Sequence, residues 1–78
     1  MPFTEHSLLI DPMEIQLNGQ IYPLEKETTL TILLESLGLA SKPVVAELNR
    51  EALLPRDFPI TPVRDGDQLE IITLAAGG

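Results

Sequence analysis

Residues 13–24, MEIQLNGQIYPL, decide the fold because they carry the pattern of a β-hairpin. Apolar and polar residues alternate from Met13 to Leu17, as expected for a strand with one buried face. Asn18-Gly19 follows, and this dipeptide strongly favours a two-residue type I′ turn. Such a turn fixes the register, which gathers the apolar residues on one face and pairs Leu17 with Gln20, Ile15 with Tyr22 and Met13 with Leu24.

A short helix is expected after the hairpin. Thr28 or Thr29 can cap its N-terminus. Gly38 lies where a left-handed residue commonly ends a helix, and Leu39 after it can contact Leu34 as in a Schellman motif. These limits predict a helix of about nine or ten residues. Its apolar stripe, at positions i, i+3, i+4 and i+7, consists of Leu30, Leu33, Leu34 and Leu37.

The second half of the chain predicts further strands. Residues 44–48 form a β-rich run, and Asn49-Arg50 forms a turn before a short segment that ends at Leu54. Residues 68–74 form the last strand, in which Leu69 and Ile71 point inward. Between these strands, prolines favour a non-repetitive loop that folds two apolar side chains over the core; the residues concerned are Pro55, Pro59, Pro62, Phe58 and Ile60.

This order of elements predicts an α+β domain with a mixed four- or five-stranded sheet and one helix across one face. We expect a right-handed crossover in which the helix joins the second strand to a parallel neighbour. A chain this short covers only one face of its sheet, so the other face meets water or a partner. Alternation along the strands places Ile72, Leu74 and Ile21 on that open face, which makes them candidate docking residues, although isolated exposed apolar residues are also normal.

The composition restricts the classes of function. The 78 residues form one domain, with an N-terminal extension over residues 1–12, the domain proper over residues 13–74 and a flexible tail over residues 75–78. The net charge of -7 argues against nucleic acid or an anionic membrane as a partner. No stretch approaches the roughly 20 apolar residues of a membrane span, and we see no secretory signal. We therefore expect a cytoplasmic protein.

The last four residues, Ala75-Ala76-Gly77-Gly78, form a slim apolar tail. Glycine has no Cβ and takes either sign of φ, so Gly77 and Gly78 can thread a channel too narrow for a side chain. An unhindered α-carboxylate on Gly78 is a chemical handle that a partner enzyme can adenylate. Small residues at a chain end are also common without any function.

No catalytic or metal-binding set of residues is recognisable elsewhere. Asp65, Asp67 and Glu70 lack the loop spacing of a calcium site, and a solvated turn explains them better. His6 is the only histidine, and the chain contains no cysteine, so no thiolate site or cysteine nucleophile exists. We expect a protein that is not itself an enzyme and that binds no metal or cofactor.

Several motifs together resemble the ThiS-like sulfur carrier proteins of thiamine biosynthesis, members of the ubiquitin-like β-grasp superfamily. The resemblance covers most of the chain, from about Met13 to Gly78. Residue 50 is Arg, where members of this family often carry Gly. The matching stretches are Ile15–Gly19, Thr28–Leu30, Leu33–Gly38, Val45–Asn49, Leu54–Arg56, Asp65–Ile72 and Gly77-Gly78.

The resemblance implies a β-grasp fold and a reaction at Gly78. A ThiF-like, E1-like adenylating enzyme would use ATP and magnesium to activate the Gly78 carboxylate. Sulfur from a cysteine-derived persulfide, supplied by a donor such as a cysteine desulfurase, would then replace AMP. The thiocarboxylate would donate sulfur to a ThiG-like thiazole synthase, with Gly77 as the slim neighbour of the reacting residue.

Other functions remain open at this point. The same terminal chemistry would serve a carrier for molybdopterin synthesis or for transfer-RNA thiolation, because only the docking surfaces differ. A ubiquitin-like modifier joined to lysines through Gly78, or an interaction domain with an inert tail, would also fit the sequence.

Overall fold

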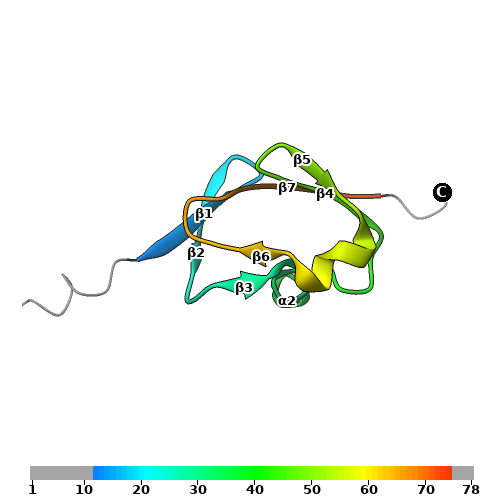
Figure 1. The fold of residues 1–78 in the computed structure, drawn as a ribbon, viewed down its shortest axis with the longest axis horizontal. Coiled ribbons are helices and arrows are strands. Elements are labelled where there is room, and N and C mark those ends of the chain that lie inside the picture. Colours follow the sequence, from blue (N-terminus) through cyan, green and yellow to red (C-terminus); the bar gives the residue numbers. More distant parts are fainter. Residues whose placement is uncertain (1–11, 75–78) are drawn as a thin grey trace, which may run out of the picture.

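The computed structural model describes residues 12–74. The N-terminal residues 1–11 and the predicted tail, residues 75–78, lie outside the described residues. Within residues 12–74, no helix is both long enough and apolar enough to cross a bilayer. The elements, labelled as in Figure 1, are β1 (Met13–Leu17), β2 (Gln20–Leu24), β3 (Thr28–Thr29), α2 (Leu30–Ser36), β4 (Val44–Leu48), β5 (Glu51–Leu53), the 3₁₀-helix η1 (Pro55–Ile60), β6 (Pro62–Val63) and β7 (Gln68–Thr73).

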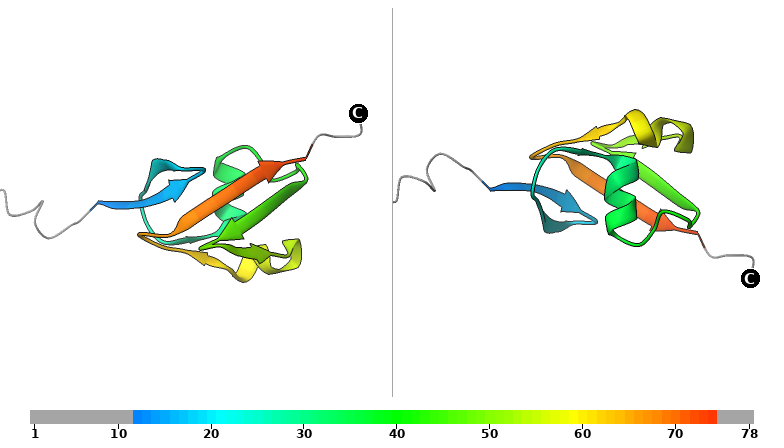
Figure 2. Two further views of the ribbon diagram at one scale, coloured as in Figure 1. Left: turned by 90° about the horizontal axis from the view of Figure 1, so that it is seen from above. Right: turned by 90° about the horizontal axis from the view of Figure 1, so that it is seen from below.

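The main sheet has five strands in the order β2-β1-β7-β4-β5, and β3 pairs with β6 in a separate two-stranded sheet. Strands β1 and β7 are parallel, whereas the other neighbours in the main sheet are antiparallel. Helix α2 lies across one face of this sheet, as the two views in Figure 2 show. This arrangement confirms the mixed sheet, the single covering α-helix and the β-grasp fold that the resemblance implies.

The first hairpin forms as the sequence predicts. Asn18 and Gly19 have φ values of 52° and 83°, as a type I′ turn requires. The observed register pairs Leu17 with Gln20, Ile15 with Tyr22 and Met13 with Leu24. Ile15 is only 1% exposed, so the hairpin places its apolar face in the core.

Helix α2 has the expected caps but only seven residues, fewer than the nine or ten predicted. The Thr29 hydroxyl accepts a hydrogen bond from the Ile32 amide at 3.3 Å. At the other end Gly38 has a φ of 77°, and the Leu39 amide donates to the Leu34 carbonyl at 2.8 Å, as in a Schellman motif. The helix is shorter than predicted because Thr29 and Leu37 are its two cap residues, so that it begins at Leu30 and ends at Ser36.

The connection through the helix differs from the one predicted. Strands β2 and β4 are not neighbours, because β1 and β7 lie between them. The parallel pair is instead β1 with β7, the two strands farthest apart in sequence. Strand β7 takes the central position because Leu69 and Ile71 are strongly apolar and become buried, at 0% and 7% exposure.

The proline-rich segment is a 3₁₀-helix rather than the non-repetitive loop predicted. In η1 the Thr61 amide donates to the Phe58 carbonyl at 3.3 Å, and Pro55 fits the first turn because its missing N–H has no partner there. Phe58 is buried at 7% exposure, but Ile60 is 76% exposed. Only Phe58 therefore covers the core as expected, and the expectation for Ile60 was wrong.

Candidate functional site

Strand β7 is the element that leads to the predicted tail. It pairs with β4 from Leu48–Leu69 to Val44–Thr73, and the Leu74 amide continues this ladder by donating to the Pro43 carbonyl at 2.9 Å. Figure 2 shows β7, in orange, between the blue strand β1 and the green strand β4. The root of the tail is therefore fixed by backbone hydrogen bonds up to Leu74.

Two asparagines from the flanking hairpin turns hold β7 in place. The Asn18 side chain accepts from the Ile71 amide at 2.8 Å and donates to the Ile71 carbonyl at 3.2 Å. The Asn49 side chain accepts from the Gln68 amide at 2.9 Å, while the Asn49 amide donates to the Gln68 carbonyl at 2.7 Å. Both asparagines have a φ of 52°. The sequence identified them as turn residues, but not as contacts of β7.

The residues predicted to react or to thread a channel cannot be placed. Gly78, Gly77, Ala76 and Ala75 all lie outside the described residues. The structure therefore describes only the strand that leads to them.

The three predicted docking residues are all exposed, but they do not lie together. Ile72 and Ile21 share the face of the sheet away from α2, with exposures of 60% and 67%. Ile21 pairs with Gln16, which is level with Gln68 on β7. Ile72 lies four residues further along β7, about 13 Å away along the strand. Leu74 is 50% exposed but lines a cavity of about 510 Å³ together with Leu34 and Phe58, on the helix side, so the prediction that it lies on the open face was wrong.

The residue beside Ile72 on the open face is Val45 of β4, directly opposite in the register. Two residues further along each strand, Glu47 faces Glu70 in the same way. These four side chains line a shallow groove of about 410 Å³, together with Gln68 and Arg50. Val45 and Glu47 could not be predicted as surface partners of β7, because nothing in a single strand reveals which residues face it across the sheet.

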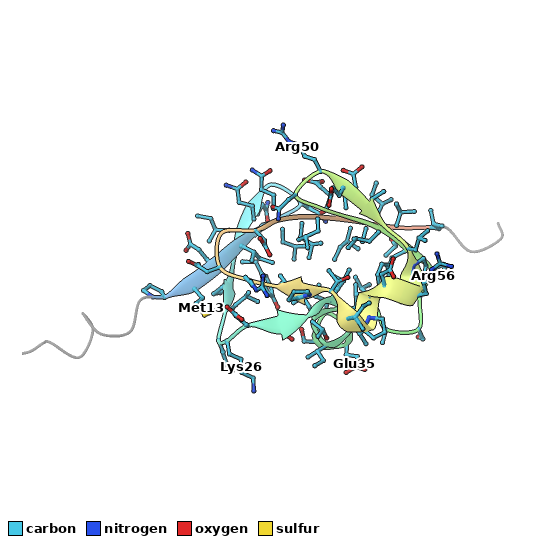
Figure 3. The ribbon with its side chains drawn as sticks, viewed as in Figure 1. Met13, Lys26, Glu35, Arg50 and Arg56 are labelled. Atoms are coloured by element: carbon cyan, nitrogen blue, oxygen red, sulfur yellow. The ribbon has the colours of Figure 1, made fainter. Side chains whose placement is uncertain are left out.

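Arg50 occupies the second position of the β4–β5 turn with a φ of 72°. This left-handed backbone favours glycine over a residue with a side chain. Figure 3 shows the Arg50 side chain pointing away from the body of the molecule, on the side of the sheet opposite α2. Within residues 12–74 the one ion pair joins Arg64 to Glu27, at 3.8 Å.

The acidic turn before β7 serves the backbone. Asp65 accepts from the Glu14 amide at 2.8 Å, which ties the turn to β1. Asp67 accepts from the Arg64 amide at 2.8 Å and from the Asn49 side chain at 3.1 Å. Among the described residues, no three histidine or acidic side chains come together as metal ligands would. The aspartates thus fix the start of β7.

Comparison with known proteins gives a consistent picture. The model of the ThiS family matches residues 15–78, a range that includes Gly77 and Gly78. A relative from Thermus thermophilus, named sulfur carrier protein ThiS, is 44% identical over 64 residues, which are 82% of this chain and 98% of the relative. A crystal structure of a thiamine biosynthesis protein (ThiS) from Geobacter metallireducens superimposes with a TM-score of 0.73, at 33% identity, over 85% of this chain and all of that one.

The chain also matches part of two larger proteins. Proteins named thiazole synthase, from Paramagnetospirillum magneticum and Magnetococcus marinus, are each 33% identical to it over 66 residues. These residues are 85% of this chain but only 20% of either relative.

Proposed function

The chain belongs to the ThiS family, and we propose that it is a sulfur carrier of thiamine biosynthesis that acts through the Gly78 carboxyl group. The observation that carries this proposal is the family match, which extends through Gly78. The matched range includes both the slim tail and β7, the central strand of the sheet that leads to it. In this role the protein is a co-substrate in the cytoplasm, while the catalytic groups, ATP and magnesium belong to its partner enzymes.

The chemistry proceeds in three steps. The Gly78 carboxylate attacks the α-phosphorus of ATP on a ThiF-like enzyme, which forms an acyl-adenylate and releases pyrophosphate. The terminal sulfur of a persulfide, supplied by a cysteine desulfurase, attacks the acyl carbon and displaces AMP. A thiol reductant then cleaves the sulfur–sulfur bond, which leaves the thiocarboxylate on Gly78. The chain has no cysteine, so its own side chains offer no competing thiol.

The acceptor we propose is a ThiG-like thiazole synthase. Support comes from the two proteins named thiazole synthase, each of which contains a stretch similar to 85% of this chain. A domain of this kind within the same polypeptide is consistent with a shared reaction. Docking through exposed apolar residues, with Ile72 and Ile21 on the open face and Leu74 on the helix side as separate candidates, would present the tail to each enzyme.

The test is to incubate the protein with ATP, magnesium, the adenylating enzyme and a sulfur source, and then with a thiol alkylator. Intact mass and fragmentation should locate one alkyl group at Gly78, since the chain offers no cysteine to the reagent. A variant without Gly78 is the control and should remain unlabelled. With an enzyme shown to be active on another carrier, absence of label on the wild-type protein would refute the carrier role.

A further inference from the structure

The open face of the sheet carries two unlike cross-strand pairs side by side. Val45 faces Ile72, and both are exposed, at 45% and 60%. Glu47 faces Glu70 on the same two strands, and all four residues line one groove of about 410 Å³. An apolar pair thus adjoins an acidic pair, two residues away on each strand.

The acidic pair is unfavourable in the isolated protein. Side chains directly opposite on neighbouring strands have Cβ atoms about 5 Å apart, and like charges in that position destabilise the sheet. Arg50 lines the same groove, but it forms no ion pair with either glutamate within residues 12–74. Within residues 12–74 neither Glu47 nor Glu70 is therefore held in an ion pair.

We propose that this groove docks a partner surface in which an arginine or lysine lies next to an apolar side chain. The cation would bind between Glu47 and Glu70, and the apolar side chain would pack on Val45 and Ile72. Charge complementarity favours a cationic partner surface, because the chain has a net charge of -7 and two adjacent carboxylates lie in the groove beside a small apolar surface. The inference rests on the proposed function, and the partner we assign is the ThiF-like adenylating enzyme.

The position of the groove supports this partner. Ile72 is two residues before Leu74, the last described residue, so the groove lies beside the strand that leads to the tail. A ThiF-like enzyme that docks here would be close to the root of the tail. Contacts with Ile72 and Glu70 would set the distance from docking surface to reacting carboxylate.

The test measures the dissociation constant of the complex with the ThiF-like enzyme, without ATP, by calorimetric titration at several salt concentrations. The double variant Glu47→Gln/Glu70→Gln should bind about tenfold more weakly and show a weaker salt dependence. Its melting temperature should rise, because the like-charge pair is gone. Glu25→Gln is the control for charge, since Glu25 is exposed and does not line this groove.

The apolar pair is tested separately. Ile72→Ser should weaken binding, whereas Ile60→Ser, which changes an even more exposed isoleucine on η1, should not. The inference would be overturned if the double glutamine variant had the same dissociation constant and the same salt dependence as Glu25→Gln. These titrations need no reaction, so they test the docking surface even if Gly78 is never labelled. If Gly78 is labelled but the variants bind as tightly as the wild type, the proposed docking surface is wrong while the carrier role stands.

Discussion

The side-chain amide of Asn18 binds both backbone groups of Ile71, 53 residues away in the sequence. The backbone amide of Asn18 also donates a hydrogen bond to the Leu69 carbonyl, at 2.9 Å. The turn of the first hairpin therefore continues the pairing of β7 beyond the point where β1 ends. Asn18 therefore forms the turn and also makes the hydrogen bonds to β7 that a longer β1 would make.

Replacing Asn18 by Gly should lower the free energy of unfolding by about 1 kcal/mol, because two hydrogen bonds are lost while the positive φ remains tolerated. Amide hydrogen exchange should accelerate at Ile71. Asn49→Gly is the matched variant, which should affect the exchange of Gln68 instead. Equal protection of Ile71 in Asn18→Gly and the wild type would show that Asn18 contributes nothing to holding β7.

Replacing Arg50 by Gly should stabilise the protein. The left-handed backbone at Arg50 costs about 1–2 kcal/mol for a residue with a Cβ, while a glycine loses about 0.5–1 kcal/mol more backbone entropy on folding. The net gain in the free energy of unfolding is then at most about 1.5 kcal/mol, measurable by urea denaturation. Arg50→Ala removes the charge but keeps the strain, and a similar gain in that variant would assign the effect to charge.

Replacing Leu33 by Ala should lower the free energy of unfolding by about 2–5 kcal/mol, because Leu33 is 3% exposed in the core. The neighbouring Ile32 is 55% exposed. Its replacement by Ala should change stability by less than about 0.5 kcal/mol. Thermal or urea unfolding of both variants checks the orientation of α2, and a larger loss for Ile32→Ala would contradict it.

Replacing Gly77 by Val should slow adenylation of Gly78 strongly without changing the stability of the domain. Valine adds bulk and restricts φ in a segment that, in the proposed function, enters the active site of the partner. The rate of pyrophosphate release with the ThiF-like enzyme measures the effect, and the melting temperature serves as the control. Undiminished adenylation would mean that the partner does not enclose this residue in a narrow channel.

Local signals in the sequence predicted the local structure well. Asn18-Gly19 defined the hairpin and its register, and the leucine stripe with Thr29 and Gly38 defined the helix and both of its caps. These features depend on residues a few positions apart, whose geometry the backbone largely determines. The helix length was overestimated because Thr29 and Leu37 are cap residues and not part of the helix itself.

Pairings between distant segments could not be read from the chain. The parallel contact of β1 with β7, the binding of β7 by Asn18 and Asn49, and the opposition of Glu47 and Glu70 all depend on sheet order. Alternation shows which face a residue takes, but not which strand lies beside it. The candidate docking residues were therefore predicted individually, while Val45 and Glu47 emerged only from the register.

The position of β7 also has a mechanical consequence. Its hydrogen bonds to β4 lie across the strand direction, as do the bonds of Ile71 to Asn18 and of Leu74 to Pro43. A force that pulls on Leu74 along the strand loads these bonds in shear, so several of them must break together before β7 slides. A partner could thus hold the chain under tension at this end while the core stays folded.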